Sequence, residues 1–69
     1  MYQVEVNVLI GEDYETVSVV DLDYYPNEEQ ALSYVDEETA NKYDTIVVQV
    51  YCYETGAPEL FAQYNYVKP

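Results

Sequence analysis

Residues 24–43 carry the sequence YYPNEEQALSYVDEETANKY, the one stretch of the chain with a helical pattern. Pro26 excludes a helical conformation at the residue before it, because the proline ring clashes with that residue. Asn27 is a suitable N-cap, and Gln30 three residues later completes a variant of the capping box. These signals predict a helix that begins at Glu28.

The residues that follow predict one continuous helix over residues 28–42, because the apolar side chains recur with helical spacing. The expected buried stripe is Leu32, Val35, Thr39 and Tyr43, with Ala31 beside it. The expected outward residues are Glu29, Ser33, Asp36, Glu37 and Ala40.

Three consecutive acids, Asp36, Glu37 and Glu38, fall in the second half of this expected helix. The helix macrodipole disfavours anions there, and only Lys42 offsets them. Neutralising the three acids is therefore expected to raise the stability of the fold.

Two stretches before the helix predict a hairpin. Residues 2–10 alternate between apolar and polar, which is typical of a half-buried strand. Residues 15–20 predict a second strand with Val17 and Val19 inward. The expected inner face of the first strand is Val4, Val6, Val8 and Ile10.

The turn of this first hairpin has two interpretations. A four-residue turn places Val8 opposite Val17 and joins the apolar faces, so we expect this register. A two-residue Gly11-Glu12 turn would instead place Glu15 beside Val8.

Residues 45–53 and 59–67 predict a second hairpin after the helix. We expect a three-residue turn, Glu54-Thr55-Gly56, with the glycine in the left-handed conformation. That turn would place Val50 opposite Leu60 and Val48 opposite Ala62. The expected inner face of the third strand is Ile46, Val48, Val50 and Cys52.

The outer face of the second hairpin carries Val47, Tyr51, Tyr53 and Phe61. These side chains are expected to form an exposed patch, through which two copies could pair as a homodimer.

The order of elements is ββαββ, which predicts a single α+β domain over residues 1–69. Its expected architecture is a two-layer sandwich, in which one helix covers one face of a four-stranded, mainly antiparallel sheet.

The charge of the chain restricts its partners. It has 14 acidic residues against two lysines, with no arginine or histidine, and a net charge of −12. Nucleic acid and anionic membranes would be repelled, because binding either requires Lys and Arg. A basic protein surface is the expected partner.

The residue types do not favour catalysis. There is no histidine to act as a base, and no Ser-His or Cys-His pair. Cys52 occupies an inward-facing position of an expected strand, which indicates a buried thiol. Asp21 and Asp23 form a carboxylate pair of the kind that glycosidases use, but so short a chain is too small for a sugar-binding cleft. We therefore expect no enzymatic activity.

We also expect neither a cofactor nor a dedicated metal site. With only Gly11 and Gly56, the chain has no glycine-rich phosphate loop. Asp21-Leu22-Asp23 and Asp36-Glu37-Glu38 offer oxygen ligands, but Tyr24-Tyr25-Pro26 interrupts the pattern of an EF-hand loop.

Residues 12–44 form an acidic belt that holds 11 of the 14 carboxylates. The belt is interpreted as a solvated face, as an adaptation to high salt, or as an imitation of nucleic acid. Outward carboxylates at i and i+2 of a strand lie roughly 6.7 Å apart, about twice the axial rise per phosphate of one DNA strand. The cost in self-repulsion favours the third interpretation.

In size, charge and lack of arginine, the chain resembles the small acidic inhibitors that bacteriophages make against host DNA-binding enzymes. That class includes anti-CRISPR, anti-restriction and uracil-DNA-glycosylase inhibitor proteins. The resemblance implies a phage protein in the cytoplasm of an infected bacterium, where it blocks the basic nucleic-acid site of a defence complex, a CRISPR effector above all. We expect no signal peptide and no membrane span.

Ten residues are candidates for contact with the partner: Asp21, Asp23, Tyr24, Tyr25, Glu28, Glu29, Tyr34, Asp36, Glu37 and Glu38. Tyr24 and Tyr25 have two interpretations, since they can fasten the start of the helix or anchor a partner.

Two other hypotheses remain open for the whole chain. It can be an acidic interaction module that binds a basic protein without competing with nucleic acid, or a housekeeping domain of a halophile. The latter predicts unfolding in low salt.

Overall fold

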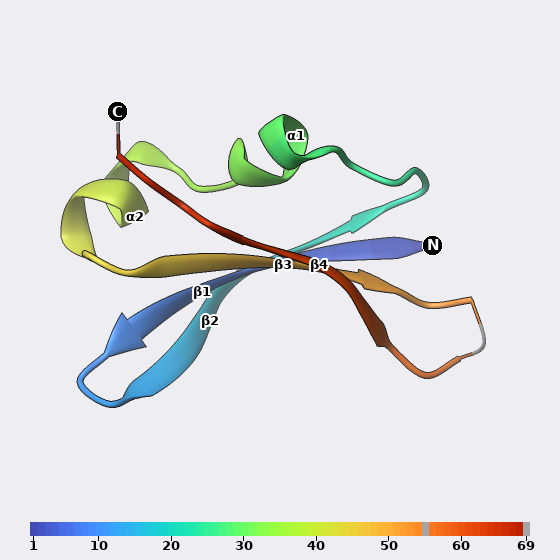
Figure 1. Ribbon diagram of the computed structural model, residues 1–69, viewed down its shortest axis with the longest axis horizontal. Helices are drawn as coiled ribbons and strands as arrows, with labels where there is room; N and C mark the ends of the chain where they lie inside the picture. The colour runs from blue at the N-terminus through green and yellow to red at the C-terminus, as the bar shows by residue number, and fades with distance from the viewer. Residues whose placement is uncertain (55, 69) are drawn as a thin grey trace.

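The computed structural model describes residues 1–54 and 56–68, which form a four-stranded antiparallel sheet with two short helices on one side (Figure 1). The elements are β1 (Tyr2–Ile10), β2 (Asp13–Leu22), α1 (Glu28–Leu32), α2 (Glu37–Lys42), β3 (Ile46–Cys52) and β4 (Glu59–Asn65). The strand order is β2-β1-β3-β4, so the two hairpins meet along β1 and β3. The α+β class and the ββαββ layers are confirmed. No helix in the described part of the chain is long and apolar enough to cross a membrane.

The core lies between the two central strands and the helices. Alternate residues of β1 and β3 point into it, as their period of two predicts. The helix layer contributes small side chains, which let the short helices lie close to the sheet. The buried cluster is Val4, Val6, Val8, Ala31, Val35, Ala40, Ile46, Val48 and Val50.

The start of the helical region follows the predicted capping box. The Asn27 side chain accepts a hydrogen bond from the Gln30 backbone N–H at 2.8 Å. In return, the Gln30 side chain accepts one from the Asn27 N–H at 3.0 Å. Pro26, just before the cap, is fully buried and fastens this turn to the core.

The prediction of one continuous helix over residues 28–42 is wrong, because α1 ends at Leu32 and α2 begins at Glu37. The Ser33 hydroxyl donates to the Gln30 carbonyl at 2.6 Å. The Asp36 backbone is extended, and its side chain caps α2 by accepting from the Thr39 N–H at 2.7 Å. Such local side-chain bonds compete with the helical hydrogen-bond ladder, which explains the break.

The break changes the environment of the residues that follow it. Ala40 is buried, contrary to the expectation that it faces water. Glu37 and Glu38 lie in the first turn of α2, and Lys42 lies in its last turn. The helix macrodipole therefore favours these charges, so the expectation that it opposes them is wrong, and with it the reason given for a gain in stability on neutralisation.

The predicted register of the first hairpin is also wrong. Ile10 lies opposite Asp13, so Gly11 and Glu12 form a two-residue turn, and Val8 lies opposite Glu15. Gly11 has φ +66°, as the first central residue of a type II′ turn requires. The tight glycine turn therefore outweighed the matching of apolar faces.

A bulge then moves the rest of β2 by one residue. Val6 lies opposite Ser18, while the next residue of β1 lies opposite Thr16, so Val17 has no partner. Val17 and Val19, predicted to point inward, are 41% and 52% exposed. The edge strand thus contributes Val20 and Leu22 to the helix side instead.

The second hairpin keeps the predicted inner face of β3 but has a different register. Val48 lies opposite Tyr64 and Val50 opposite Ala62, two residues beyond the prediction, and the ladder ends at Asn65. A second bulge leaves Phe61 without a partner. The predicted three-residue turn includes Thr55, which lies outside the described residues.

We predict that Gly11→Ala lowers the free energy of unfolding by about 1 kcal/mol, because alanine is strained in the left-handed conformation. A Cβ at this position would meet nothing within 4 Å, so the loss comes from the backbone alone. Gly11→Asn should lose less, since asparagine adopts this conformation more readily. Urea unfolding measures all three proteins, and equal stability of wild type and Gly11→Ala would contradict the prediction.

Candidate functional site

Five of the predicted site carboxylates lie together on the helix layer. Glu28 and Glu29 occupy the first turn of α1, Asp36 caps α2, and Glu37 and Glu38 occupy its first turn. All five are exposed, and both helices lie on the same side of the sheet (Figure 1). We call Glu28, Glu29, Asp36, Glu37 and Glu38 the helix-layer acids.

Asp21, in β2, and Asp23, just after that strand, lie apart from the helix-layer acids along the chain. Asp21 pairs with Gln3, and its carboxylate accepts a hydrogen bond from the Gln3 amide at 3.0 Å. Gln3 has the opposite parity to the buried valines of β1, so Asp21 faces away from the helices. Asp23 is exposed beyond the end of β2 and lines a shallow hollow with Met1 and Leu22. The structure therefore separates Asp21 from the helix-layer acids.

Asp36 is the helix-layer acid whose ionisation is most clearly favoured by its surroundings. Hydrogen bonds from Thr39, first of all from its backbone N–H, hold the pKa of Asp36 below its ordinary value of 3.8. Such bonds stabilise the carboxylate over the neutral acid. Asp36 is therefore both a structural cap and a fixed negative charge at neutral pH.

The two tyrosines before α1 make different contacts. Tyr24 is exposed and hydrogen-bonds to half-buried Tyr34, which is the main cause that raises the pKa of Tyr34 above 10.0. Tyr25 packs edge-on against Tyr2, with ring centroids 5.4 Å apart, and against Phe61 at 6.0 Å. Both tyrosines thus fasten the segment before α1, and both keep an exposed surface that a partner can contact.

Both lysines of the chain lie near α2. Lys42 places its ammonium group 5.5 Å from the centre of the Tyr43 ring. Lys68 lines a hollow together with Glu37 and Ala40, where the C-terminal segment passes α2.

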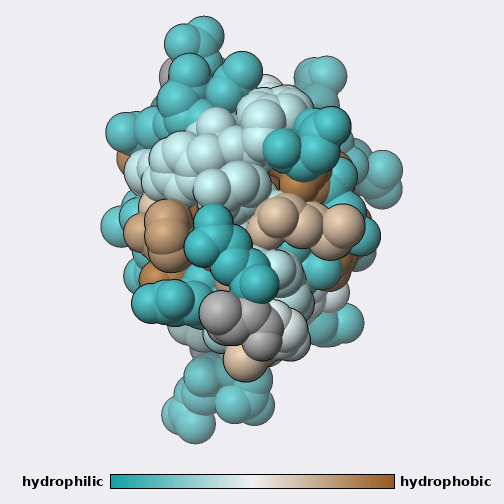
Figure 2. Space-filling view, turned by 90° about the vertical axis from the view of Figure 1, so that its right-hand side faces the viewer, coloured by the Kyte–Doolittle hydropathy of each residue, from teal (hydrophilic) through white to brown (hydrophobic). Residues whose placement is uncertain are grey.

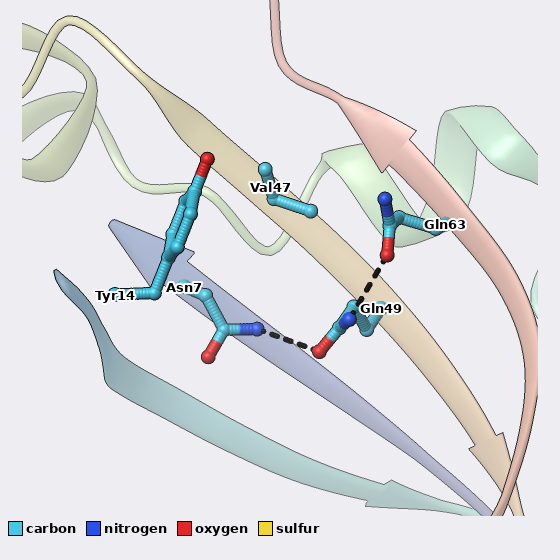
Figure 3. Close-up of a pocket in the computed structure, with 5 residues that line it drawn as sticks. All are labelled: Asn7, Tyr14, Val47, Gln49 and Gln63. Carbon is cyan, nitrogen blue, oxygen red and sulfur yellow. Dashed lines mark hydrogen bonds between the residues drawn. The ribbon is translucent and has the colours of Figure 1, made fainter. Parts of the chain in front are cut away.

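The sheet face that the helices leave open is a network of neutral amides, which sequence reasoning missed. Asn7 donates to Gln49 at 3.1 Å, and Gln49 donates to Gln63 at 3.0 Å (Figure 3). The Tyr51 hydroxyl donates to the same Gln49 oxygen at 2.9 Å, and the Tyr53 hydroxyl to Gln3 at 2.8 Å. The spacing of these residues was visible in the sequence, but their contact depends on the strand order β1-β3-β4.

The predicted apolar patch on this open face is therefore wrong. Val47, Tyr51 and Tyr53 are half-buried, and both tyrosine hydroxyls are bonded within the network. Phe61 belongs to the other face, since its ring contacts Tyr2, which shares a side of β1 with the core valines. The bulge in β4 accounts for this reversal, because a bulge changes the direction of the side chain.

The open face has one shallow hollow, of about 250 Å³. Tyr14, Val47 and the three amides of the network line it (Figure 3). Burial of the Tyr51 hydroxyl, followed by the charge of Glu5, raises the pKa of Tyr51 above 10.0. This face therefore offers a network of neutral hydrogen-bonding groups, with the carboxylates of Glu5 and Asp21 beside it.

Within residues 1–54 and 56–68, no three His, Cys, Asp or Glu side chains lie close enough together to hold a metal ion. Cys52 is buried, as its parity in β3 predicts.

Comparison with known proteins found no matching family model, no similar curated protein and no similar solved structure. The exposed carboxylates of the helix layer and the tyrosines beside them are the features from which a function is inferred.

We predict that the capping carboxylate of Asp36 makes a stability contribution that is lost in acid. The folded state lowers this pKa, so the contribution is complete above the ordinary value of 3.8 and disappears as the pH falls through the lower folded-state value. Asp36→Asn keeps a capping oxygen but cannot titrate.

The measurement is the difference in unfolding free energy between wild type and Asp36→Asn, followed from about pH 7 to about pH 2.5. The difference cancels the effect of protonating the other carboxylates. We expect it to stay constant down to about pH 5 and then to shift in favour of Asp36→Asn. A difference that does not change with pH would contradict the prediction.

Proposed function

We propose that this protein is a non-enzymatic inhibitor that binds the basic nucleic-acid-binding surface of a host defence complex, a CRISPR effector above all. By occupying that surface, it blocks the binding of DNA or RNA. Its place of action is the cytoplasm of an infected bacterium. The observation that carries the proposal is the exposure of all five helix-layer acids on one side of the molecule.

Electrostatics supports this kind of partner. A net charge of −12 on 69 residues destabilises any compact state through self-repulsion. A partner with a basic surface would relieve this repulsion when it binds. A groove lined with lysine and arginine is built to accept closely spaced anions. Opposite charges would also steer the two proteins together at a high, salt-dependent rate.

The local structure supports a preorganised array of charges. Each short helix has a side-chain cap, and four of the five acids lie in first turns, where the macrodipole favours anions. The array therefore needs little ordering when a partner binds, which limits the entropic cost of association.

A second candidate function follows from the aromatic side chains. Tyr25 and Phe61 are exposed and in contact with each other, and a phosphate backbone has no apolar group equivalent to them. They favour an acidic interaction module that binds a basic protein without excluding nucleic acid. The two functions differ in whether DNA or RNA competes with this protein for the partner.

The test is a competition experiment with the protein immobilised as bait in bacterial lysate at low salt. Bound proteins are eluted first with DNA and then with high salt. Release of a nuclease or CRISPR effector by DNA would support the inhibitor, and the released protein would then be assayed for DNA binding in the presence of the bait. Release by salt alone would support the interaction module, and an empty eluate would contradict both functions.

We predict that Glu37→Gln/Glu38→Gln slows association with the released partner about tenfold at low salt. The midpoint of thermal unfolding should change little, because relief of repulsion offsets the loss of favourable charges at the start of α2. Stopped-flow association and thermal melting measure the two quantities.

The matched control is Glu12→Gln/Glu15→Gln, which removes the same charge from exposed positions of the β1–β2 hairpin. We expect a much smaller effect on the association rate from this control. Equal slowing by the two variants would show that only net charge matters, and the helix layer would lose its assigned role.

A further inference from the structure

Three aromatic rings form a cluster at the end of the molecule where β1 begins. The centroid of the Tyr2 ring lies 5.4 Å from that of Tyr25 and 6.4 Å from that of Phe61, and Tyr25 and Phe61 are 6.0 Å apart. All three pairs are edge-on, with interplanar angles of 64–69°. We call Tyr2, Tyr25 and Phe61 the aromatic triad.

The triad joins three segments that are distant in sequence. Tyr2 lies in β1, Tyr25 lies between β2 and α1, and Phe61 is the unpaired residue of the β4 bulge. The bulge directs Phe61 toward Tyr2, although regular alternation along β4 would direct it to the open face. Bulges are positioned features that redirect side chains, so the orientation of Phe61 calls for an explanation beyond strand pairing.

Among residues 1–54 and 56–68, the side chains around the triad cover it only in part. Tyr25 and Phe61 are 45% and 53% exposed, although they pack against each other. Met1 is also exposed at this end and lines a hollow with Leu22, which lies opposite Tyr2 in the sheet. Figure 2 shows separate hydrophobic spots at this end, among near-neutral and hydrophilic residues. An exposed apolar cluster with a polar rim is the arrangement found at the centre of protein interfaces.

The rim of the triad is acidic. Across the sheet, Leu22 pairs with Tyr2, Tyr2 with Cys52, and Cys52 with Glu59. Glu59 therefore lies at the end of the row of residues that contains Tyr2. Glu28 begins α1, three residues after Tyr25, and its charge is one of the causes that raise the pKa of Tyr64, after burial and a hydrogen bond with Tyr25. Asp23 lines the hollow beside Met1. Carboxylates therefore lie close in sequence to the rings of the cluster: Asp23 and Glu28 on either side of Tyr25, and Glu59 two residues before Phe61.

These features determine the chemistry of an occupant. A second copy of this chain is disfavoured, because each copy carries a net charge of −12. A cationic segment with an apolar side chain satisfies both the rim and the centre. Arginine suits the site best, since a guanidinium group pairs with carboxylates and stacks on aromatic rings.

We infer that the aromatic triad docks an arginine-containing peptide segment of the protein partner, with an apolar side chain of that segment packed on the exposed surfaces of Tyr25 and Phe61. Arginines that flank this side chain pair with Asp23, Glu28 and Glu59. The inference rests on the proposed function for the basic character of the partner, and it adds an apolar anchor at one end of the helix layer.

The test uses three synthetic hexapeptides as probes: RLRLRL, RSRSRS and ELELEL. Amide chemical shifts of the isotope-labelled protein are followed during titration with each peptide at low salt. We expect RLRLRL to bind about tenfold more tightly than RSRSRS, because only the former offers an apolar anchor. The largest shifts should fall at Tyr2, Tyr25 and Phe61, and ELELEL should not bind.

Phe61→Ala should abolish the preference for RLRLRL over RSRSRS and leave the weaker, salt-dependent binding of both peptides. The matched control is Tyr14→Ala, since Tyr14 is similarly exposed at 56% and lies opposite Leu9, near the other end of β1. That end is roughly 23 Å from Tyr2 at about 3.3 Å per residue. Tyr14→Ala should keep the preference.

Phe61→Lys is a second variant in case the alanine variant does not fold, because lysine is well tolerated in edge strands. It should weaken binding of both cationic peptides, and of RLRLRL most.

Equal affinity for RLRLRL and RSRSRS, with shifts confined to α1 and α2, would overturn the anchor and leave the proposed function standing. Failure of both cationic peptides to bind would contradict the basic partner itself. Binding of ELELEL as tight as that of RLRLRL, or a homodimer that Phe61→Ala dissociates, would also overturn the inference.

Discussion

The contact between the valines of β1 and β3 and the small side chains of the helix layer is the constraint on which the rest of the structure depends. Val4, Val6, Val48 and Val50 present a flat, fully buried surface. Ala31 and Ala40 are short enough for two one-turn helices to lie close to it. Because these helices are too short to be stable alone, their packing on the sheet must stabilise them. This small core covers only the middle of the sheet, so the ends of the hairpins and the aromatic triad stay exposed.

Local hydrogen bonds help this fold to remain stable with a net charge of −12, although its core is small. The break between α1 and α2 turns Asp36 into a cap and moves Glu37 and Glu38 from the middle of a helix to the beginning of one. There the macrodipole favours the charges that it would otherwise oppose. The anionic surface and the division of the helix are thus two aspects of one arrangement. In a continuous helix these acids would lower the stability of the fold, whereas at the beginning of α2 they stabilise that helix.

Local signals were sufficient for much of the fold. The capping box of Asn27 and Gln30, the alternation of β1 and β3, and the ββαββ order are all present in the structure. The registers of both hairpins were not predictable in the same way, because they depend on the two-residue Gly11-Glu12 turn and on a bulge in each edge strand. The candidate site was likewise predictable only in part. Exposure of the helix-layer acids is expected of charged side chains without a partner, whereas the position of Asp21 on the opposite face and the turn of Phe61 toward Tyr2 depend on those bulges.

The sequence by itself determined the class of fold and the anionic surface, because these follow from composition, from periods along the chain and from caps that span only three residues. Only the tertiary structure decided which side chains meet. The aromatic triad joins Tyr2, Tyr25 and Phe61, and the amide network joins Asn7, Gln49 and Gln63, across strands whose order and register no local pattern specifies. The physical reason is that a one-residue slip in a strand reverses the face of every side chain after it, and the energies that choose between registers are spread over the whole sheet.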